Sequence, residues 1–214
     1  MDLFLWGRLF KRLTKNSLCP RALCYTAVMK KEITIQTEFT PNPHSLKFNV
    51  NVPLCMHGAV HFASKAESGK SPLAAKLFEI EYIKEVMIGP DFVTVTRNEA
   101  VRSWAPVIPK VSEVIRQYLS CGKTDSKVCQ ACADQLNPHS EVESKIIEIL
   151  DEQIRPALAR DGGDVLFCGY ENGIVKLHLK GACSGCPSAM MTLKMGVEQV
   201  LKEYIPEIKE VVRV

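Results

Sequence analysis

The sequence predicts an α+β protein made of two small α+β domains joined by a polar linker. Its 214 residues are enough for two domains of ordinary size, and 46% hydrophobic with 24% charged residues suits buried cores under a hydrated surface. Strand-like alternation and helix-like periodicity follow each other in both halves of the chain. Between the halves, residues 120–141 are polar and contain loop-forming residues, which predicts a linker there.

Residues 1–30 differ in composition from the rest and predict a transit peptide. Residues 1–31 hold seven basic residues and one acid, so their net charge is +6, whereas the whole chain carries +3. Apolar residues such as Leu5, Trp6 and Leu9 are interleaved with the bases, which is typical of organellar targeting segments. A disordered basic tail, or an extension upstream of a true start at Met29, would have the same composition.

The charge and cysteine content of the remaining chain exclude several classes of protein. Beyond residue 31 the net charge is −3, which argues against a nucleic-acid binder because such proteins present a basic face. No apolar run approaches the 18 residues of a membrane-spanning helix, so membrane insertion is not expected. Nine cysteines, odd in number and unevenly spaced, indicate metal or redox chemistry rather than a disulfide framework.

Two strand pairs are predicted in the first half of the chain. Apolar residues alternate with polar ones over residues 33–39 and 46–50, with a Pro-Asn-Pro turn between the two runs. Residues 83–88 and 92–96 flank a Gly-Pro-Asp sequence in the same way, which predicts a second hairpin.

Two helices complete the first predicted domain, residues 31–119. Ser71 followed by Pro72 has the pattern of an N-cap with proline in the first helical position. Apolar residues at helical spacing continue from Trp104 to Tyr118, so the second helix should end before Cys121. This half has no group of His, Cys, Asp and Glu at ligand spacing, and its histidines are interpreted as surface or core residues: His44, His57 and His61.

The second predicted domain, residues 142–214, opens with a capped helix. Ser140 and Glu143 have capping-box spacing. An apolar stripe then follows at helical intervals: Val142, Ile146, Ile149, Leu150, Ile154 and Leu158. Pro156 falls near the end of this stripe, where proline would bend or close the helix rather than interrupt its middle, and an Asp-Gly-Gly-Asp sequence ends the helix.

A hairpin, a helix and a last strand complete an α-β-β-α-β order. Residues 165–170 and 174–180 flank Asn172-Gly173, a strong type I′ turn signal. The final strand is predicted over residues 208–214. The helix before it should run from about 188 to 204, and its inner stripe is predicted as Leu193, Val197, Val200, Leu201 and Tyr204.

The loop between this hairpin and this helix contains Cys183 and Cys186. Two cysteines with two residues between them can direct both sulfurs to one metal ion or one edge of a cluster. Pro187 suits the first helical position, so Cys186 is predicted at the N-cap, where the positive helix end should lower a thiol pKa. Gly181 and Gly185 leave room for a bulky cluster. Because no His or carboxylate is near in the sequence to act as a base, the loop does not suggest hydrolysis or acyl transfer.

The pair is compatible with a thioredoxin-like redox site, half of a zinc ribbon, or half of a cluster site shared by two copies. A redox pair is expected in a βαβ unit, which the predicted order does not provide. Cys129 and Cys132 form the other close pair, but roughly 50 residues separate it from Cys183. It is interpreted as incidental, as a second metal site with Cys121, or as completing the main site. Cys168 is predicted to be a buried strand thiol.

Several sequence runs resemble a known family. The C-terminal domain of NifU-type iron–sulfur proteins is closely similar in four places: IRPAL at 154–158, DGGD at 161–164, GACSGCPS at 181–188 and TLK at 192–194. The N-terminal domain of two-domain Nfu scaffold proteins is similar in four more: TPNP at 40–43, SLKF at 45–48, SPLA at 71–74 and DFVTVT at 91–96. The resemblance covers residues 32–119 and 142–214.

This resemblance implies an iron–sulfur cluster carrier without catalytic activity. Such a protein receives a cluster from upstream assembly proteins, holds it at Cys183 and Cys186 as a homodimer, and passes it to recipient apoproteins. A 4Fe–4S cluster is expected, with 2Fe–2S as the other type. For mitochondrial members the recipients include lipoyl synthase and respiratory iron–sulfur enzymes, which implies the mitochondrial matrix; a bacterial cytoplasm, with translation starting at Met29, is the alternative. The first domain inherits no ligands and is expected to contact partners.

Two other functions remain open on the residues alone. One is a thiol–disulfide oxidoreductase that uses Cys183 and Cys186, and the other is a zinc-binding adaptor that uses the linker cysteines. The chain also departs from the family pattern in two places, residues 49–61 and the pair Cys129 and Cys132.

Overall fold

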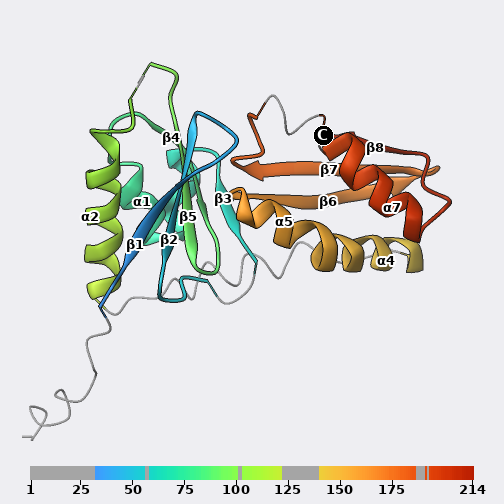
Figure 1. Ribbon diagram of the computed structural model, residues 1–214, viewed down its shortest axis with the longest axis horizontal. Helices are drawn as coiled ribbons and strands as arrows, with labels where there is room; N and C mark the ends of the chain where they lie inside the picture. The colour runs from blue at the N-terminus through green and yellow to red at the C-terminus, as the bar shows by residue number, and fades with distance from the viewer. Residues whose placement is uncertain (1–31, 56–57, 101–102, 122–139, 187–190, 192) are drawn as a thin grey trace, which may run out of the picture. The chain divides into compact units, whose positions relative to one another are not determined.

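Two β-sheets, one in each half of the chain, organise the computed structural model (Figure 1). The structure describes residues 32–55, 58–100, 103–121, 140–186, 191 and 193–214. Ile33–Val214 form one compact unit. The predicted transit peptide and most of the predicted linker lie outside the described residues. No helix in the described ranges has the length and apolar character needed to cross a membrane.

The first sheet is antiparallel throughout and has the strand order β1-β2-β5-β4-β3. Both predicted strand pairs are confirmed, because β1 pairs with β2 and β4 pairs with β5. The third strand begins within residues 49–61, the segment that departs from the family pattern, and the sequence did not predict it. The strands are β1 (Ile35–Phe39), β2 (Ser45–Val50), β3 (Val60–Phe62), β4 (Ile83–Ile88) and β5 (Phe92–Arg97).

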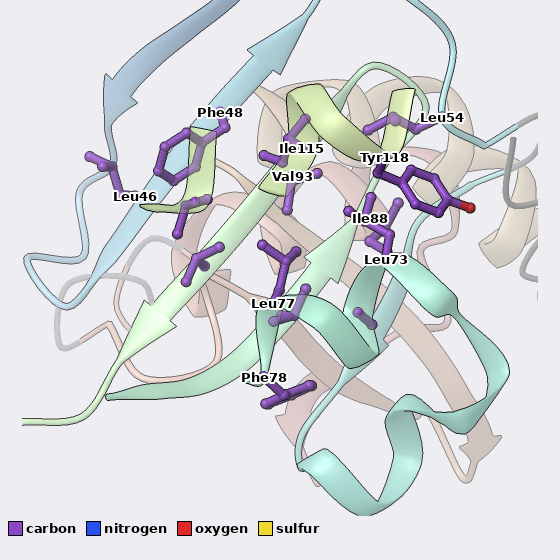
Figure 2. Close-up of a cluster of buried hydrophobic side chains, with 14 of the residues drawn as sticks. Leu46, Phe48, Leu54, Leu73, Leu77, Phe78, Ile88, Val93, Ile115 and Tyr118 are labelled. Atoms are coloured by element: carbon purple, nitrogen blue, oxygen red, sulfur yellow. The ribbon is translucent and has the colours of Figure 1, made fainter. Parts of the chain in front are cut away.

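One face of the first sheet carries the hydrophobic core of this half. The α-helices packed against it are α1 (Pro72–Leu77) and α2 (Val107–Ser120), and a 3₁₀ helix, η1 (Lys65–Lys70), precedes α1. Ser71 caps α1 as predicted, since its Oγ accepts a hydrogen bond from the Ala74 amide at 3.1 Å. Figure 2 shows Leu73 and Leu77 in a cluster with residues of the sheet and of α2.

The second sheet has the order β6-β7-β8, where β6 is Gly163–Glu171, β7 is Ile174–Gly181 and β8 is Glu210–Arg213. The predicted hairpin is confirmed. Asn172 and Gly173 have φ angles of 52° and 88°, as a type I′ turn requires. The last strand pairs in parallel with β7, so the intervening helix acts as a crossover.

The helical segment before the second sheet is continuous but changes its pitch. It consists of α4 (Glu141–Ile149), a π turn η2 (Leu150–Ile154) and α5 (Arg155–Arg160). The π turn ends two residues before Pro156, which has no amide hydrogen to donate, so the wider turn accommodates the proline. The predicted stripe faces the core: Ile146, Leu150 and Ile154 are buried, and Val142, Ile149 and Leu158 pack against them.

Two predictions of burial are wrong in this half. Tyr204 is 59% exposed because α7 (Glu198–Tyr204) ends there and the chain turns, so that Ile205 and Ile208 fill the core instead. Cys168 is exposed because a bulge in the β6–β7 pairing lies between Phe167 and Gly169 and interrupts the alternation. A π turn, η3 (Leu193–Val197), precedes α7. The predicted helix start at Cys186-Pro187 reaches beyond the described residues.

Candidate functional site

Both predicted ligands lie in the cysteine loop, which we define as residues 181–186. Gly181 ends β7 with a φ of +63°, a conformation that glycine adopts without strain and that turns the chain out of the strand. The Ser184 amide donates to the Gly181 carbonyl at 3.0 Å and closes this turn. Cys183 and Cys186 are 5% and 4% exposed, so the loop brings together two buried thiols.

The Asp-Gly-Gly-Asp turn lies against the same loop. The Ala182 amide donates to the carbonyl of Gly162 at 3.1 Å, and Gly162 itself has a φ of +74°. Gly163 pairs with Gly181 across the hairpin, and a Cβ atom on Gly163 would overlap with Sγ of Cys183. The turn therefore ends a helix, as predicted, and also shapes the seat of one cysteine.

A cavity of about 340 Å³ opens beside the two cysteines. Most of the cavity wall is apolar. The wall is formed by the helical segment before β6, the helix that follows the cysteine loop, and the turn between β1 and β2. The lining residues include Asn42, Ile154, Leu158, Cys183, Cys186 and Val197. Small and apolar walls around two sulfurs suit an inorganic cluster, whose properties depend on burial and limited contact with water.

The electrostatics of Cys183 differ from the sequence-based expectation. Burial raises the pKa of this thiol to about 12, and the negative charges of Asp161, Cys186 and Asp164 add to the effect. The sequence had placed no carboxylate near the pair, whereas the fold brings Asp161 and Asp164 close to Cys183. Burial also raises the pKa of Asp164, against the opposing charge of Arg155. Cys183 keeps its proton in this state, so a metal must displace that proton to bind.

The remaining described cysteines do not join this pair in a metal-ligand group. Within the described ranges, no group of three or more His, Cys, Asp and Glu side chains could hold a metal ion. Cys55 is buried in the first half, whereas Cys121 is exposed near the end of α2. Cys129 and Cys132 lie outside the described residues. The described part of one chain thus offers two sulfurs at the site.

Asn42 and Glu85 of the first half form hydrogen bonds with the cysteine loop, and neither was predicted as a site residue. The side-chain amide of Asn42 donates to the Ala182 carbonyl at 3.0 Å, and the Ser184 hydroxyl donates to Oε2 of Glu85 at 3.0 Å. Asn42 lies in the Pro-Asn-Pro turn, which was predicted only as a connection between strands. Its place in a family-like motif is the signal that pointed to it.

Family models match both halves of the chain. The model described as "NifU-like domain" matches residues 146–212, and "Scaffold protein Nfu/NifU N terminal" matches residues 35–122. Two relatives bear the name NFU1 iron-sulfur cluster scaffold homolog, mitochondrial. The one from Drosophila ananassae is 41% identical over 86% of this chain and 65% of its own length. The human one is 40% identical over 84% of this chain and 71% of its own length.

The chain belongs to the Nfu family of iron–sulfur cluster scaffold proteins. The predicted α+β class is confirmed, and the two sheets correspond to the Nfu N-terminal and NifU-like domains. An Nfu protein is a scaffold and not an enzyme, as the sequence also predicted. The chain spans about two thirds of the length of these mitochondrial relatives. A solved NifU-like protein from Saccharomyces cerevisiae matches 44% of this chain and 84% of its own, with a TM-score of 0.40 and 24% identity.

Proposed function

We propose that this Nfu protein carries a 4Fe–4S cluster that two copies hold jointly through Cys183 and Cys186. The supporting observation is the number of donors: two buried thiols border one apolar cavity, and the described residues offer no larger ligand group. Cubane clusters in proteins are held by four thiolates. Two copies supply four, and the cluster then lies between them.

A cluster held in this way is cargo rather than a resident cofactor. Each copy contributes one two-sulfur half, so separating the halves exposes the cluster to a recipient's thiolates. Burial and neighbouring carboxylates raise the pKa of the Cys183 thiol, so protons compete with the metal for this sulfur. The apolar residues of the second half that line the cavity, among them Ile154, Leu158 and Val197, limit the access of water to the cluster while it is bound.

The resemblance to the family supports a wider setting for this function. The cluster comes from upstream iron–sulfur assembly proteins and goes to recipient apoproteins such as lipoyl synthase and respiratory iron–sulfur enzymes. The names of the relatives include "mitochondrial", and the basic segment 1–30 suits a transit peptide for the matrix. Residues 31–119 and 142–214 are the two domains, and residues 120–141 link them.

The decisive experiment is anaerobic reconstitution with iron and sulfide, followed by Mössbauer spectroscopy and native mass measurement. The wild type should contain one 4Fe–4S cluster per dimer, and Cys183→Ser should lose both the cluster and the cluster-linked dimer. Cys168→Ser is the matched control, because it removes an exposed thiol of the same half and should leave both unchanged. A full cluster in Cys183→Ser, or a strictly monomeric protein that retains its cluster, would contradict the proposal. A 2Fe–2S spectrum would correct the cluster type.

The thiol–disulfide oxidoreductase is the weaker candidate. The attacking group in such enzymes is a thiolate, which a low pKa favours, whereas burial and neighbouring carboxylates raise the pKa of Cys183. An insulin-reduction assay on the cluster-free protein should therefore give no turnover above that of Cys183→Ser.

A further inference from the structure

The first sheet is buried on the face that its own helices do not cover. All six residues of β5 are buried, although the hydrophobic core accounts only for alternate ones. Neighbouring strands align the remaining side chains in two rows, because Met87 and Lys47 both pair with Thr94, and Glu85 and Ser45 both pair with Thr96. We call these six residues the helix-free face: Ser45, Lys47, Glu85, Met87, Thr94 and Thr96.

The segments that cover the helix-free face also build the cysteine site. The Lys47 ammonium donates to the carbonyl of Arg160 at 3.2 Å. A Cβ atom on Gly162 would lie 2.9 Å from Oγ1 of Thr94, and a Cβ on Gly181 would lie 2.6 Å from Sδ of Met87. Gly162 and Gly181, whose backbones border Cys183 in the fold, therefore pack directly against the first sheet.

One charged hydrogen bond joins this face to Ser184, one of the two residues between the cysteines. Oε2 of Glu85 accepts from the Ser184 hydroxyl at 3.0 Å and pairs with Nε2 of His61 at 3.2 Å. Lys84 lies 3.2 Å from Oε1 of the same carboxylate. These partners, His61 first, lower the pKa of Glu85 to about 2 despite its burial, so it is ionised at neutral pH and accepts strongly. Arg213, in β8, donates to the carbonyl of the same Ser184.

The rest of the contact suits a reversible association. Besides the Ser184–Glu85 bond, hydrogen bonds from Asn42 and Lys47 to backbone carbonyls cross it, and polar contacts of this kind are usual between parts of a chain that move relative to one another. Among the described residues, Oγ1 of Thr94 is buried without a hydrogen-bond partner, although Thr94 is only 1% exposed. An unpaired buried hydroxyl has an energetic cost that is relieved when water reaches it, so this feature favours opening.

We propose that Glu85 is a positioning residue: its hydrogen bond to Ser184 holds the cysteine loop against the helix-free face. This face thereby covers the cysteine pair and can separate from it. This inference rests on the proposed function. A cluster shared by two copies needs both sulfurs of each copy to face the other copy, while in the cluster-free protein the loop rests on the first sheet. The second copy with its cluster and the first sheet therefore compete for the cysteine loop.

Alkylation of the cluster-free, full-length protein tests the cover without any cluster. The rates at which iodoacetamide labels Cys183 and Cys186 are measured by peptide mass spectrometry under native conditions. A hydrogen bond to a charged group is worth about tenfold in an equilibrium, so Glu85→Ala and Ser184→Ala should each raise these rates about tenfold. The double variant should label no faster than either single one, because both remove the same contact.

Matched controls separate the cover from a general loss of structure. Glu113→Ala removes an exposed carboxylate paired with Arg116 on α2 and should leave labelling unchanged. Ser184→Thr keeps the hydroxyl and should label at the wild-type rate. Cys55, buried in the first half, is an internal reference whose labelling should stay constant in every variant. Unchanged rates in the two alanine variants, additive effects in the double variant, or a parallel rise at Cys55 would each overturn the proposal.

Reconstitution then distinguishes this inference from the proposed function. Glu85→Ala should take up its cluster faster than the wild type and reach the same final content. If Cys183→Ser loses the cluster while Glu85→Ala neither labels nor loads faster, the carrier function stands and the cover is wrong. If Cys183→Ser keeps a full cluster, the carrier site is wrong whatever the alkylation rates are.

Discussion

At the scale of single residues, glycines, which carry no side chain, shape the cysteine site as much as the thiols do. Gly163 faces Gly181 across the hairpin, and the space that a Cβ would occupy on Gly163 is filled by Sγ of Cys183. This thiol is thus seated directly against backbone, where no methyl group fits. The sulfur keeps its position because the opposite strand leaves it room.

Replacing Gly163 by alanine should therefore displace Cys183. We expect Gly163→Ala to lower the free energy of unfolding by about 1–3 kcal/mol, the usual cost of overpacking, and to lower cluster content after reconstitution. Urea unfolding of the cluster-free protein and iron analysis measure the two effects. Gly69→Ala is the control, because a Cβ at Gly69 would meet no atom within 4 Å. The interpretation is wrong if the two variants behave alike.

At the scale of elements, the capped start of α4 fixes where the second half begins to fold into helix. The Ser140 hydroxyl accepts a hydrogen bond from the Glu143 amide at 3.2 Å, satisfying one of the free amides at the helix start. The segment then continues through η2 into α5, and its buried residues form one side of the core around Val165 and Leu177. The same segment supplies Ile154 and Leu158 to the cavity wall.

Loss of this cap should destabilise the second half without touching the cysteines. Ser140→Ala should lower the free energy of unfolding by about 1 kcal/mol, the typical value of an N-cap side chain. Ser144→Ala changes the same residue type one turn later, inside the helix, where alanine is the better helix former, and should cause no loss. Equal urea midpoints for both variants would show that the cap contributes little.

Most elements could be predicted because their signals are local. The N-caps Ser71 and Ser140 and the Asn172-Gly173 turn act within a few residues, and the structure confirms all three. The failures have non-local or geometric causes. The bulge that exposes Cys168 has no clear sequence signal, and the helix end that exposes Tyr204 depends on where the chain turns into the core.

The candidate site was predicted only in part for the same reason. Its ligands could be found from the sequence because two cysteines two residues apart are a local pattern. Their surroundings could not, since Ser184 and Glu85 are 99 residues apart in the chain, and Asn42 and Ala182 are 140 apart. The high pKa of Cys183 depends on burial and on carboxylates that the fold brings near, so it too followed only from the structure.

At the scale of the whole molecule, Glu85 links the two halves of the chain through a charge. Its pKa is lowered from 4.5 to about 2 in the folded protein, chiefly by the hydrogen bond with His61 and also by Ser184 and Lys84. A carboxylate whose pKa is lower in the folded state stabilises that state above its unfolded pKa. The stabilisation is therefore complete above about pH 4.5 and is lost as the pH falls toward 2.

Acidification should consequently erase the difference between the wild type and Glu85→Gln. At pH 6 we expect the glutamine variant to be less stable by about 2 kcal/mol, which is below the full value of the pKa change because the carboxylate retains some contact with water. The difference should shrink steadily between pH 4.5 and pH 2, since glutamine does not titrate. Urea unfolding at a series of pH values measures this difference in stability.

Glu113→Gln, whose partner Arg116 is also exposed, should differ little from the wild type at any pH, because exposed ion pairs contribute little. A difference for Glu85→Gln that persists undiminished at low pH would mean that its shape, rather than its charge, holds the cysteine loop on the first sheet.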